Sequence, residues 1–485
     1  MTDNQSEHFD LVFRSWIPVV TVSGRRREVG LLRLFREAHR IQRIVGATPP
    51  TTVALHRLAF MVLRRAFGRL DEEHWLALWA VHRLPGGRLR RYLTAHRPGF
   101  DLLHPERPFL QDPRLATHGP PSRVAALVRA AGQPVADSPP DGNAPALTPA
   151  EAARWLVTAR MCPAVAPPAA DASECRFVDG LVEGADLKET LLLNFGTRGP
   201  AAGPVPARAR PRVLLAVRRG GGGPEVTGVW LAPGDRAGPT GVGGTSSPAP
   251  ARSPEPSASE GADGSGERSL HQDLWNLYRD FVVGDRPGSG PPVGAAARRA
   301  VATLAVHGWV SASASITARL LAQDRCPADS RTTAVDLPVA LPAALLTGRE
   351  TVVLPAMRAA VALAERVGRA LDELKSRLSA RAARVLDPEP AHWPALWARI
   401  SAVLADLARA VVPTGGARAA AVRWARELRG EAWRIVDSWV EHLPDDVDGL
   451  IRLYRDVAEF DARLDQGISQ FITDMSAPLS IPWAD

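Results

Sequence analysis

The segment AERVGRALDELKSRL, residues 364–378, repeats apolar side chains at intervals of three and four residues. This spacing places the apolar side chains on one face of a helix. The same spacing recurs in three later segments, at Leu396, Ile400, Val403 and Leu407, at Leu428, Ala432, Ile435 and Trp439, and at Leu453, Val457, Phe460 and Leu464. Short breaks containing Pro or Gly separate these segments. The pattern predicts an antiparallel four-helix bundle at the C-terminal end of the chain.

The N-terminal part has a different pattern. Residues 9–13 and 17–22 are typical of two short strands, and residues 29–45 have the periodicity of a helix. We therefore predict an α+β fold: a mostly helical N-terminal domain with short β-hairpins over residues 1–334, followed by a C-terminal four-helix bundle over residues 335–485.

Further elements are predicted from caps and periodicity. Thr148 and Glu151 have the spacing of a capping box, which predicts a helix to about Arg160. Helices are also expected after Thr51, after Asp71 and near 186–193, 270–282 and 293–306, and a hairpin is expected from 213–217 and 226–231. Residues 234–266 hold 8 Gly, 5 Pro and 6 Ser, so we expect a flexible loop there.

Composition indicates a globular protein. Hydrophobic residues make up 45% of the 485 residues, and no apolar run is long enough for a membrane span. The polar N-terminus lacks the pattern of a secretion signal. The only cysteines are Cys162, Cys175 and Cys326, an odd and sparse set that argues against a disulfide framework. We therefore expect a cytoplasmic protein that does not contact a membrane.

Positive charge is concentrated near the N-terminus. Residues 1–100 hold 17 Arg and 8 acidic residues, whereas residues 401–485 hold 9 Arg and 14 acidic residues. A basic lobe is compatible with nucleic-acid binding and also with a merely solvated basic surface. Arg25, Arg26 and Arg27 lie at the predicted hairpin turn, where they could contact phosphate, guide RNA or only solvent.

Common catalytic motifs are absent. No phosphate-binding Gly-Lys-Ser/Thr, His-Glu-x-x-His or Gly-x-Ser-x-Gly motif occurs. The cysteines could ligate zinc only with further ligands, and free buried thiols are the better interpretation. His104 and Glu106 are separated by prolines that preclude a helix, so a structural turn is expected there. We predict a protein that is not an enzyme and that has no cofactor and no metal.

Three ordered segments resemble one known family. The first comprises Phe9–Val12, Ser15–Val19, Arg27–Val29 and Glu37–Ile41, the second is Phe100–Gln111, and the third is Asp186–Asn194. Together they resemble the CasA family, the large subunit of the type I-E CRISPR Cascade complex, of which this chain would be a divergent member. The predicted C-terminal bundle agrees with that family's architecture.

The resemblance implies a non-catalytic subunit. It would dock on the crRNA-containing Cascade, with its backbone, small and guide-end subunits. It would bind target double-stranded DNA near the protospacer-adjacent motif, assist duplex opening and recruit the helicase–nuclease. Base pairing with the guide would then specify the target, because proteins of such complexes recognise only the short adjacent motif and the duplex shape.

The loops that the resemblance marks as DNA-binding depart from the family pattern. The glycine-rich loop falls at residues 163–177, which contain no glycine; Ala169, Ser173 and Arg176 are its candidate residues. The wedge-like loop falls at Ser311, Ser313 and Ser315, with Ser313 where the family has glutamine. The basic loop is replaced by the 234–266 segment, whose region supplies Arg236, Arg252 and Arg268.

Three alternatives remain. The chain could be a docking scaffold whose motif recognition is vestigial or altered, with partner contacts from Trp393, Trp397, Trp424, Trp433 and Trp439, although most of these are better interpreted as bundle core. Ser313 could equally cap a helix that begins near Ile316. A metal-dependent enzyme built on Cys162 and Cys175 is the weakest alternative.

Overall fold

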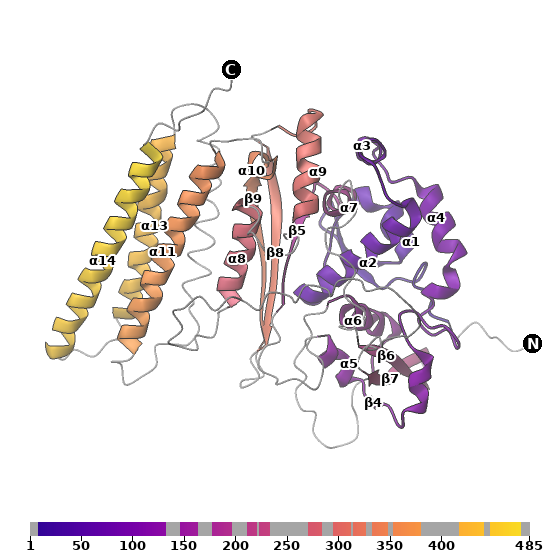
Figure 1. The fold of residues 1–485 in the computed structure, drawn as a ribbon. Coiled ribbons are helices and arrows are strands. Elements are labelled where there is room, and N and C mark those ends of the chain that lie inside the picture. The colour runs from indigo at the N-terminus through magenta and orange to yellow at the C-terminus, as the bar shows by residue number, and fades with distance from the viewer. Residues whose placement is uncertain are drawn as a thin grey trace, which may run out of the picture.

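The structure is a computed structural model, and it describes most of the chain. The described residues are 8–131, 146–162, 177–195, 211–220, 223–232, 270–283, 294–311, 314–325, 332–347, 353–379, 417–440 and 447–476. Within these ranges the strands form three antiparallel three-stranded sheets, and helices make up most of the remainder (Figure 1). The fold is therefore of the predicted α+β class. No helix in the described part of the chain is long and apolar enough to cross a membrane.

The first sheet lies near the N-terminus. Its strands are β1 (Ile17–Thr21), β2 (Arg26–Val29) and β3 (Ile41–Ile44), in the order β2-β1-β3. Between β2 and β3 lie the short helix α1 (Leu31–Arg36) and a 3₁₀ turn, η2 (Ala38–Arg40).

Two N-terminal predictions are wrong. The segment 9–13 forms a turn instead of a strand, because Leu11 N–H donates to the Phe100 carbonyl oxygen at 3.0 Å and ties the turn to a distant loop. The helix expected over 29–45 ends at Arg36, and the buried Ile41 and Ile44 lie in β3. Apolar residues three apart fit a helix, but here the two isoleucines are the buried ends of a four-residue strand.

Helices α2 to α7 build the rest of the N-terminal part. Their bounds are α2 (Pro49–Phe67), α3 (Glu72–Ala80), α4 (Gly86–Ala95), α5 (Ala125–Ala130), α6 (Pro149–Met161) and α7 (Leu187–Phe195), with 3₁₀ turns η3 (Arg97–Phe100) and η4 (Pro113–Thr117). The capping box of Thr148 and Glu151 is present, which confirms the predicted start of α6. Asp71 caps α3 through the His74 N–H, and His82 lies beyond the end of that helix.

The second sheet contains the predicted hairpin. Strands β6 (Arg212–Gly220) and β7 (Gly223–Ala232) pair antiparallel, and β4 (Ser122–Arg123) pairs with the other edge of β7. The hairpin predicted from residues 213–217 and 226–231 is therefore confirmed, with longer strands than expected.

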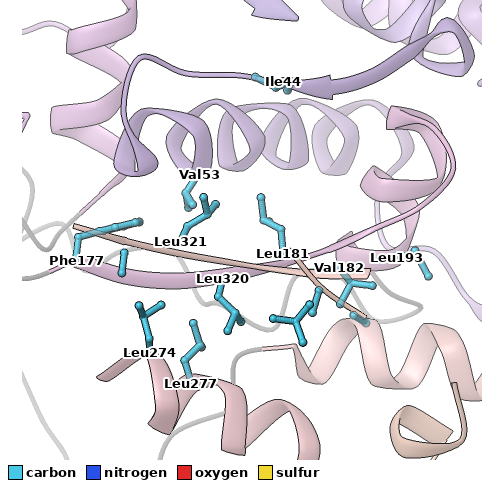
Figure 2. Packing of buried hydrophobic residues seen from close by; sticks show 14 of the residues in the cluster. Ile44, Val53, Phe177, Leu181, Val182, Leu193, Leu274, Leu277, Leu320 and Leu321 are labelled. Carbon is cyan, nitrogen blue, oxygen red and sulfur yellow. The ribbon is translucent and has the colours of Figure 1, made fainter. Parts of the chain in front are cut away.

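The third sheet lies at the centre of the molecule and was not predicted. Its strands are β5 (Phe177–Glu183), β8 (Ser315–Arg325) and β9 (Thr332–Pro342), in the order β5-β8-β9. Helix α2 covers one face and α8 (Leu270–Val283) covers the other; Leu321 points toward Val53 of α2, and Leu320 points toward Leu274 and Leu277 of α8 (Figure 2). The helix considered near Ile316 is wrong, because Ile316 pairs with Leu341 in this sheet.

Helices α9 (Ala295–Val306) and α10 (Ala343–Thr347) flank this sheet, and α8 and α9 confirm the two helices expected there. The C-terminal part contains the long helices α11 (Val353–Ser379), α13 (Ala417–Val440) and α14 (Val447–Ser476), which lie side by side (Figure 1). Most of their repeated apolar residues are buried, Val457 partly so. The segment expected to form the fourth helix, around 396–407, lies outside the described residues, and so does the loop 234–266.

The bundle tryptophans are mostly core residues, as the sequence favoured. Trp424 is 1% exposed, Trp439 is 9% exposed and Trp433 is partly buried against the same core. Trp393 and Trp397 lie outside the described residues. The boundary expected between 334 and 335 falls inside β9, and the division into two domains stays a prediction.

The stability of this fold should depend on the protonation of one buried histidine. His56 of α2 is 2% exposed, and its Nδ1 donates to the Thr52 carbonyl oxygen at 2.8 Å. Burial lowers the pKa of His56 to about 4, because the imidazolium would lose its hydration. The unfolded imidazole titrates near its ordinary pKa of about 6.5, so unfolding takes up a proton between these two pH values.

We therefore expect the free energy of unfolding to be highest above pH 6.5 and to fall by about 3 kcal/mol from this group as the pH falls to about 4. Urea unfolding at stepped pH values measures this, with His56→Gln as the variant that lacks the titrating group. Parallel pH profiles for the two proteins would contradict the prediction.

Candidate nucleic-acid interface

The turn between β1 and β2 holds the predicted Arg25–Arg27 cluster in a defined shape. Thr21 N–H donates to the Arg25 carbonyl oxygen at 3.0 Å, and Arg25 N–H donates to Thr21 Oγ1 at 3.0 Å. Gly24 has a φ of +81°, which a glycine adopts without strain. The Val22 N–H donates to the Arg40 carbonyl oxygen at 3.0 Å and fixes the turn against η2. The arginines are thus presented by a hydrogen-bonded turn.

A basic groove lies beside this turn. Its volume is about 910 Å³. It is lined by Thr21, Val22, Ser23, Arg25, Arg26, Arg27, Arg33, Glu37, His39, Arg40 and His82. The fold therefore joins the three predicted arginines to Arg33 of α1 and Arg40 of η2, and no local pattern predicted that these two would lie beside them.

Among the described residues that line this groove, Glu37 is the only carboxylate. Its Oε2 accepts from Arg27 Nη2 at 2.5 Å, and its Oε1 accepts from Arg33 Nε at 3.0 Å. Burial raises the pKa of Glu37, but the hydrogen bonds and charges of Arg27 and Arg33 outweigh that effect and hold the pKa below its usual range. Glu37 therefore stays ionised and orients two of the arginines.

The remaining guanidiniums of the groove are available to a ligand. Arg25, Arg26 and Arg40 are exposed, and none of them forms an ion pair with another described residue. A guanidinium offers several N–H donors in a planar fork that matches phosphate oxygens. The groove can therefore bind the phosphates of a nucleic-acid backbone, which is the contact that sequence-independent binding uses.

Two histidines form the inner wall of the groove. The rings of His39 and His82 meet edge to face with centroids 4.8 Å apart. Both ring nitrogens of His39 are buried without a hydrogen-bond partner among the described residues. Burial lowers the pKa of His39, and the nearby charges of Arg83, His82 and Arg40 lower it further. His39 is thus neutral at pH 7, and the net positive charge of the groove comes from its arginines.

The wedge-like loop lies at the junction of α9 and β8. Ser311 and Ser315 are exposed, and the Ala314 N–H donates to the Ser311 carbonyl oxygen at 3.0 Å. Ser315 is the first residue of β8 and pairs with Pro342. Ser313 lies outside the described residues. The structure therefore places Ser311 and Ser315 on the surface, at one end of the central sheet.

The sequence analysis missed an exposed tryptophan next to this loop. Val306, the last residue of α9, is 52% exposed. Trp309 follows the helix, just before Ser311, and is 53% exposed. Gly308 has a φ of +73°, and His307 Nε2 lies 3.4 Å from Glu72 Oε1 of α3. An exposed indole can stack on an unpaired base. The signal in the sequence was a Gly-Trp pair directly after a helical stretch.

The other predicted site residues fall outside the described part of the chain. They are Ala169, Ser173 and Arg176 of the loop at 163–177, and Arg236, Arg252 and Arg268.

Nothing among the described residues forms a candidate metal site, that is, a cluster of three His, Cys, Asp or Glu side chains. Cys162 is 1% exposed, and its Sγ donates to the Pro50 carbonyl oxygen at 3.2 Å. Burial raises the pKa of its thiol to about 12, so it is not a thiolate at neutral pH. Cys175 and Cys326 lie outside the described residues. Cys162 is therefore a core residue.

Several side chains of the segments that resemble the CasA family form hydrogen bonds with backbone groups of the protein. Asp101 Oδ1 accepts from the N–H groups of Phe9 and Leu103, at 3.0 and 3.1 Å. Gln111 donates to the Leu102 carbonyl oxygen at 2.7 Å and accepts from the Leu215 N–H at 2.8 Å. His104 Nδ1 accepts from the N–H groups of Glu106 and Arg107, which confirms the expected structural turn.

Asn194 does the same in the third segment. Its side chain accepts from the Val182 N–H at 3.0 Å and donates to the Val182 carbonyl oxygen at 2.6 Å, which fixes α7 against β5. These residues therefore determine how the segments pack.

Comparisons with known proteins agree with this fold. The family model described as CRISPR-associated protein Cse1 matches residues 10–256. A CasA/Cse1 protein of Thermus thermophilus is 36% identical over 203 residues, which cover 39% of this chain and 40% of that relative. The crystal structure of Thermobifida fusca Cse1 has a TM-score of 0.67 at 22% identity, over 96% of this chain and 98% of that chain.

A chain of a CRISPR RNA-guided surveillance complex is also similar. Its TM-score is 0.60 at 17% identity, over 96% of this chain and 99% of that chain. At these identities the structural likenesses concern the fold, whereas the family-model match covers half of the chain.

The groove arginines give a first test. We expect the double variant Arg25→Gln/Arg26→Gln to bind a double-stranded DNA oligonucleotide more weakly and to lower the slope of log affinity against log salt by about 2, if each guanidinium contacts one phosphate. Fluorescence anisotropy over a salt series measures both quantities.

The matched control is Arg423→Gln/Arg426→Gln, which removes two exposed arginines from α13. Equal slopes for the groove variant and the control would show that the groove does not contact the DNA.

Proposed function

Because the chain belongs to the CRISPR-associated protein Cse1 family, we propose that it is the non-catalytic large subunit of a type I-E CRISPR Cascade surveillance complex. In this role it binds target double-stranded DNA near the protospacer-adjacent motif, assists duplex opening and R-loop formation, and recruits the helicase–nuclease. It acts in the cytoplasm, where the target DNA is reached without crossing a membrane. It needs no cofactor, because base pairing and binding energy supply the work of opening the duplex.

One observation carries the DNA-binding part of the proposal. The groove beside the β1–β2 turn gathers five arginines around a single carboxylate, and three of the five form no ion pair with the described residues. Arginines that line a groove and have no carboxylate partner attract a polyanion such as DNA. Their contacts with phosphates fix the position of the DNA without specifying its sequence. This is the contact that a subunit needs if base pairing with a guide specifies the target.

The partners of the proposal are the crRNA-containing subunits of Cascade, which are the backbone, small and guide-end subunits. The likeness to a chain of a CRISPR RNA-guided surveillance complex supports this assignment. The alignment with the Thermus thermophilus relative covers 40% of that protein, so assembly and recruitment are proposed for this chain on the strength of the family and the fold.

Duplex opening is assigned to the loop between α9 and β8. Ser311 and Ser315 are exposed there, and Trp309 precedes them with half of its surface exposed. Hydroxyls can hydrogen-bond base edges, and an indole can support a base that has left its stack. The rigid sheet behind the loop gives it a fixed base.

The proposal is tested by assembling Cascade with and without this chain. We expect the complete complex to bind matched duplex DNA more tightly than the incomplete one and to show a steeper salt dependence, because the groove adds phosphate contacts. Filter binding over a salt series measures the affinity and the slope. Equal affinity and equal slope for the two complexes would refute the proposal.

A second candidate function is that of a docking scaffold with vestigial or altered motif recognition. It is favoured by the exposed side chains of Ile451 and Tyr454, which are 57% and 74% exposed on α14 and could contact a partner. The buried Trp424 and Trp439 are unsuited to that role because they belong to the bundle core.

The two functions predict different responses to the adjacent motif. If the chain recognises the motif, scrambling the motif beside an unchanged protospacer weakens target binding by the complete complex, with a loss of about tenfold for each 1.4 kcal/mol of recognition. Gel-shift titration with both duplexes measures the change. A complex that this chain stabilises, and that binds both duplexes equally, would identify a scaffold.

A further inference from the structure

A second basic surface lies on α4, on the C-terminal end of α2 and on the turn that follows α2, outside the lining of the groove. We call it the arginine face, and its exposed members are Arg64, Arg65, Arg69, Arg88, Arg90 and Arg91. On α4 the side chains of Leu89 and Leu93 are buried, and the three arginines of that helix lie on its exposed side. In Figure 1, α4 lies on the side of the molecule opposite the C-terminal helices.

The chain supplies almost no negative charge to this surface. Residues 38–70 and 74–100 contain no Asp and no Glu. The carboxylates between these stretches are Asp71, Glu72 and Glu73, at the start of α3. Asp71 caps that helix and contacts His74, and Glu72 faces His307. Among the described residues, none of the six arginines has an ion-pair partner.

Some arginines of the C-terminal helices have carboxylate partners, whereas others, among them Arg418, Arg423 and Arg426, are exposed without one among the described residues. In the C-terminal helices, Arg377 pairs with Glu459 at 2.6 Å, and Arg429 pairs with Asp461 at 2.8 Å, each across two helices. A surface ion pair contributes little to stability, but a cluster of like charges without counter-charges is unfavourable for the isolated chain. Six such arginines gathered on one surface, in stretches of chain without Asp or Glu, are therefore suited to an external polyanion.

The arginine face is held rigidly and contains aromatic rings. Helix α4 packs against α2 and α1. The rings of Tyr92 and His96 lie with centroids 4.5 Å apart, and His96 is exposed. The charge of Arg65 acts on the Tyr92 phenol, which places the end of α2 beside the middle of α4. Arginines next to aromatic rings are the combination that proteins use to hold single-stranded nucleic acid.

We propose that the arginine face binds the phosphodiester backbone of a nucleic-acid strand without sequence preference, as a contact surface additional to the groove. This inference deepens the proposed function and rests on it, because the nucleic-acid strand would be one that the chain encounters as part of Cascade. An acidic protein could also be attracted by charge, but the aromatic rings among the guanidiniums favour a nucleic acid. The DNA and RNA forms share the phosphodiester, and the experiment distinguishes them.

The test uses the full-length chain by itself and the triple variant Arg88→Gln/Arg90→Gln/Arg91→Gln. The matched control is Arg418→Gln/Arg423→Gln/Arg426→Gln, which removes three arginines from exposed positions of α13 and lowers the net charge equally. The probes are 20-nucleotide single-stranded DNA, single-stranded RNA and duplex DNA of the same length, with polyglutamate as the acidic-protein analogue. Circular dichroism establishes that each variant is folded.

If each of the three guanidiniums contacts a phosphate, the slope of log affinity against log salt falls by about 2 for single strands. If the variant and the parent chain bind with equal affinity at 1 M salt, this change of slope corresponds to about a hundredfold lower affinity of the variant at 0.1 M salt. The control keeps the affinity and slope of the parent chain. The probe with the largest loss identifies the strand.

Two results would overturn the inference. One is an equal loss for the α4 variant and the control, since that would reflect net charge alone. The other is a loss for polyglutamate with none for the nucleic acids, which would assign the face to an acidic protein. Failure of the chain to join Cascade would refute the proposed function and leave this binding result unchanged, so the two failures can be told apart.

Discussion

Strand β8 lies between β5 and β9, and burial of this sheet on both faces is the constraint on which the rest of the fold depends. Leu320 and Leu321 point to opposite faces and are almost fully buried (Figure 2). Ion pairs border this sheet: Arg57 donates to Asp179 at 2.7 Å, and Arg319 Nε lies 3.0 Å from Glu183 Oε1. Burial raises the pKa of both carboxyls against the opposing charges of the arginines. Removal of one side chain from either ion pair would leave the other side chain as an unpaired charge in a mostly buried position.

The same sheet determines where the basic groove can be. Helix α7 is fixed to β5 by Asn194, and α7 also packs against β3 and η2. The element η2 carries Arg40, whose carbonyl oxygen accepts from the Val22 N–H of the turn. A continuous series of contacts therefore runs from the central sheet to the arginines. The third resembling segment has a structural part in this series, which explains why its residues face the backbone of neighbouring elements and not a ligand.

The sequence predicted the elements whose signals are local. The capping box at Thr148 and the hairpin of β6 and β7 were found because caps and turns act over a few residues. The central sheet was missed because β5 pairs with a strand more than a hundred residues away, so its partner is set by tertiary packing and not by local pattern. For the same reason Arg25–Arg27 were identified from a turn, whereas Arg33 and Arg40 join them only through the fold of α1 and η2.

Arginine content alone did not separate a functional surface from a compositional bias. The structure separates them by the partners of each guanidinium. Arg377, Arg429 and Arg463 of the C-terminal helices meet carboxylates of neighbouring helices, so their charge is balanced within the fold. Arg25, Arg26 and Arg40 of the groove and the three arginines of α4 form no ion pair with a described residue, and those of α4 lie in a stretch, residues 74–100, without Asp or Glu. A bias in base composition would add arginine along the whole chain, but it would not by itself gather unpaired guanidiniums on one surface. This clustering of unpaired arginines is the observation behind the proposal that the N-terminal part binds nucleic acid.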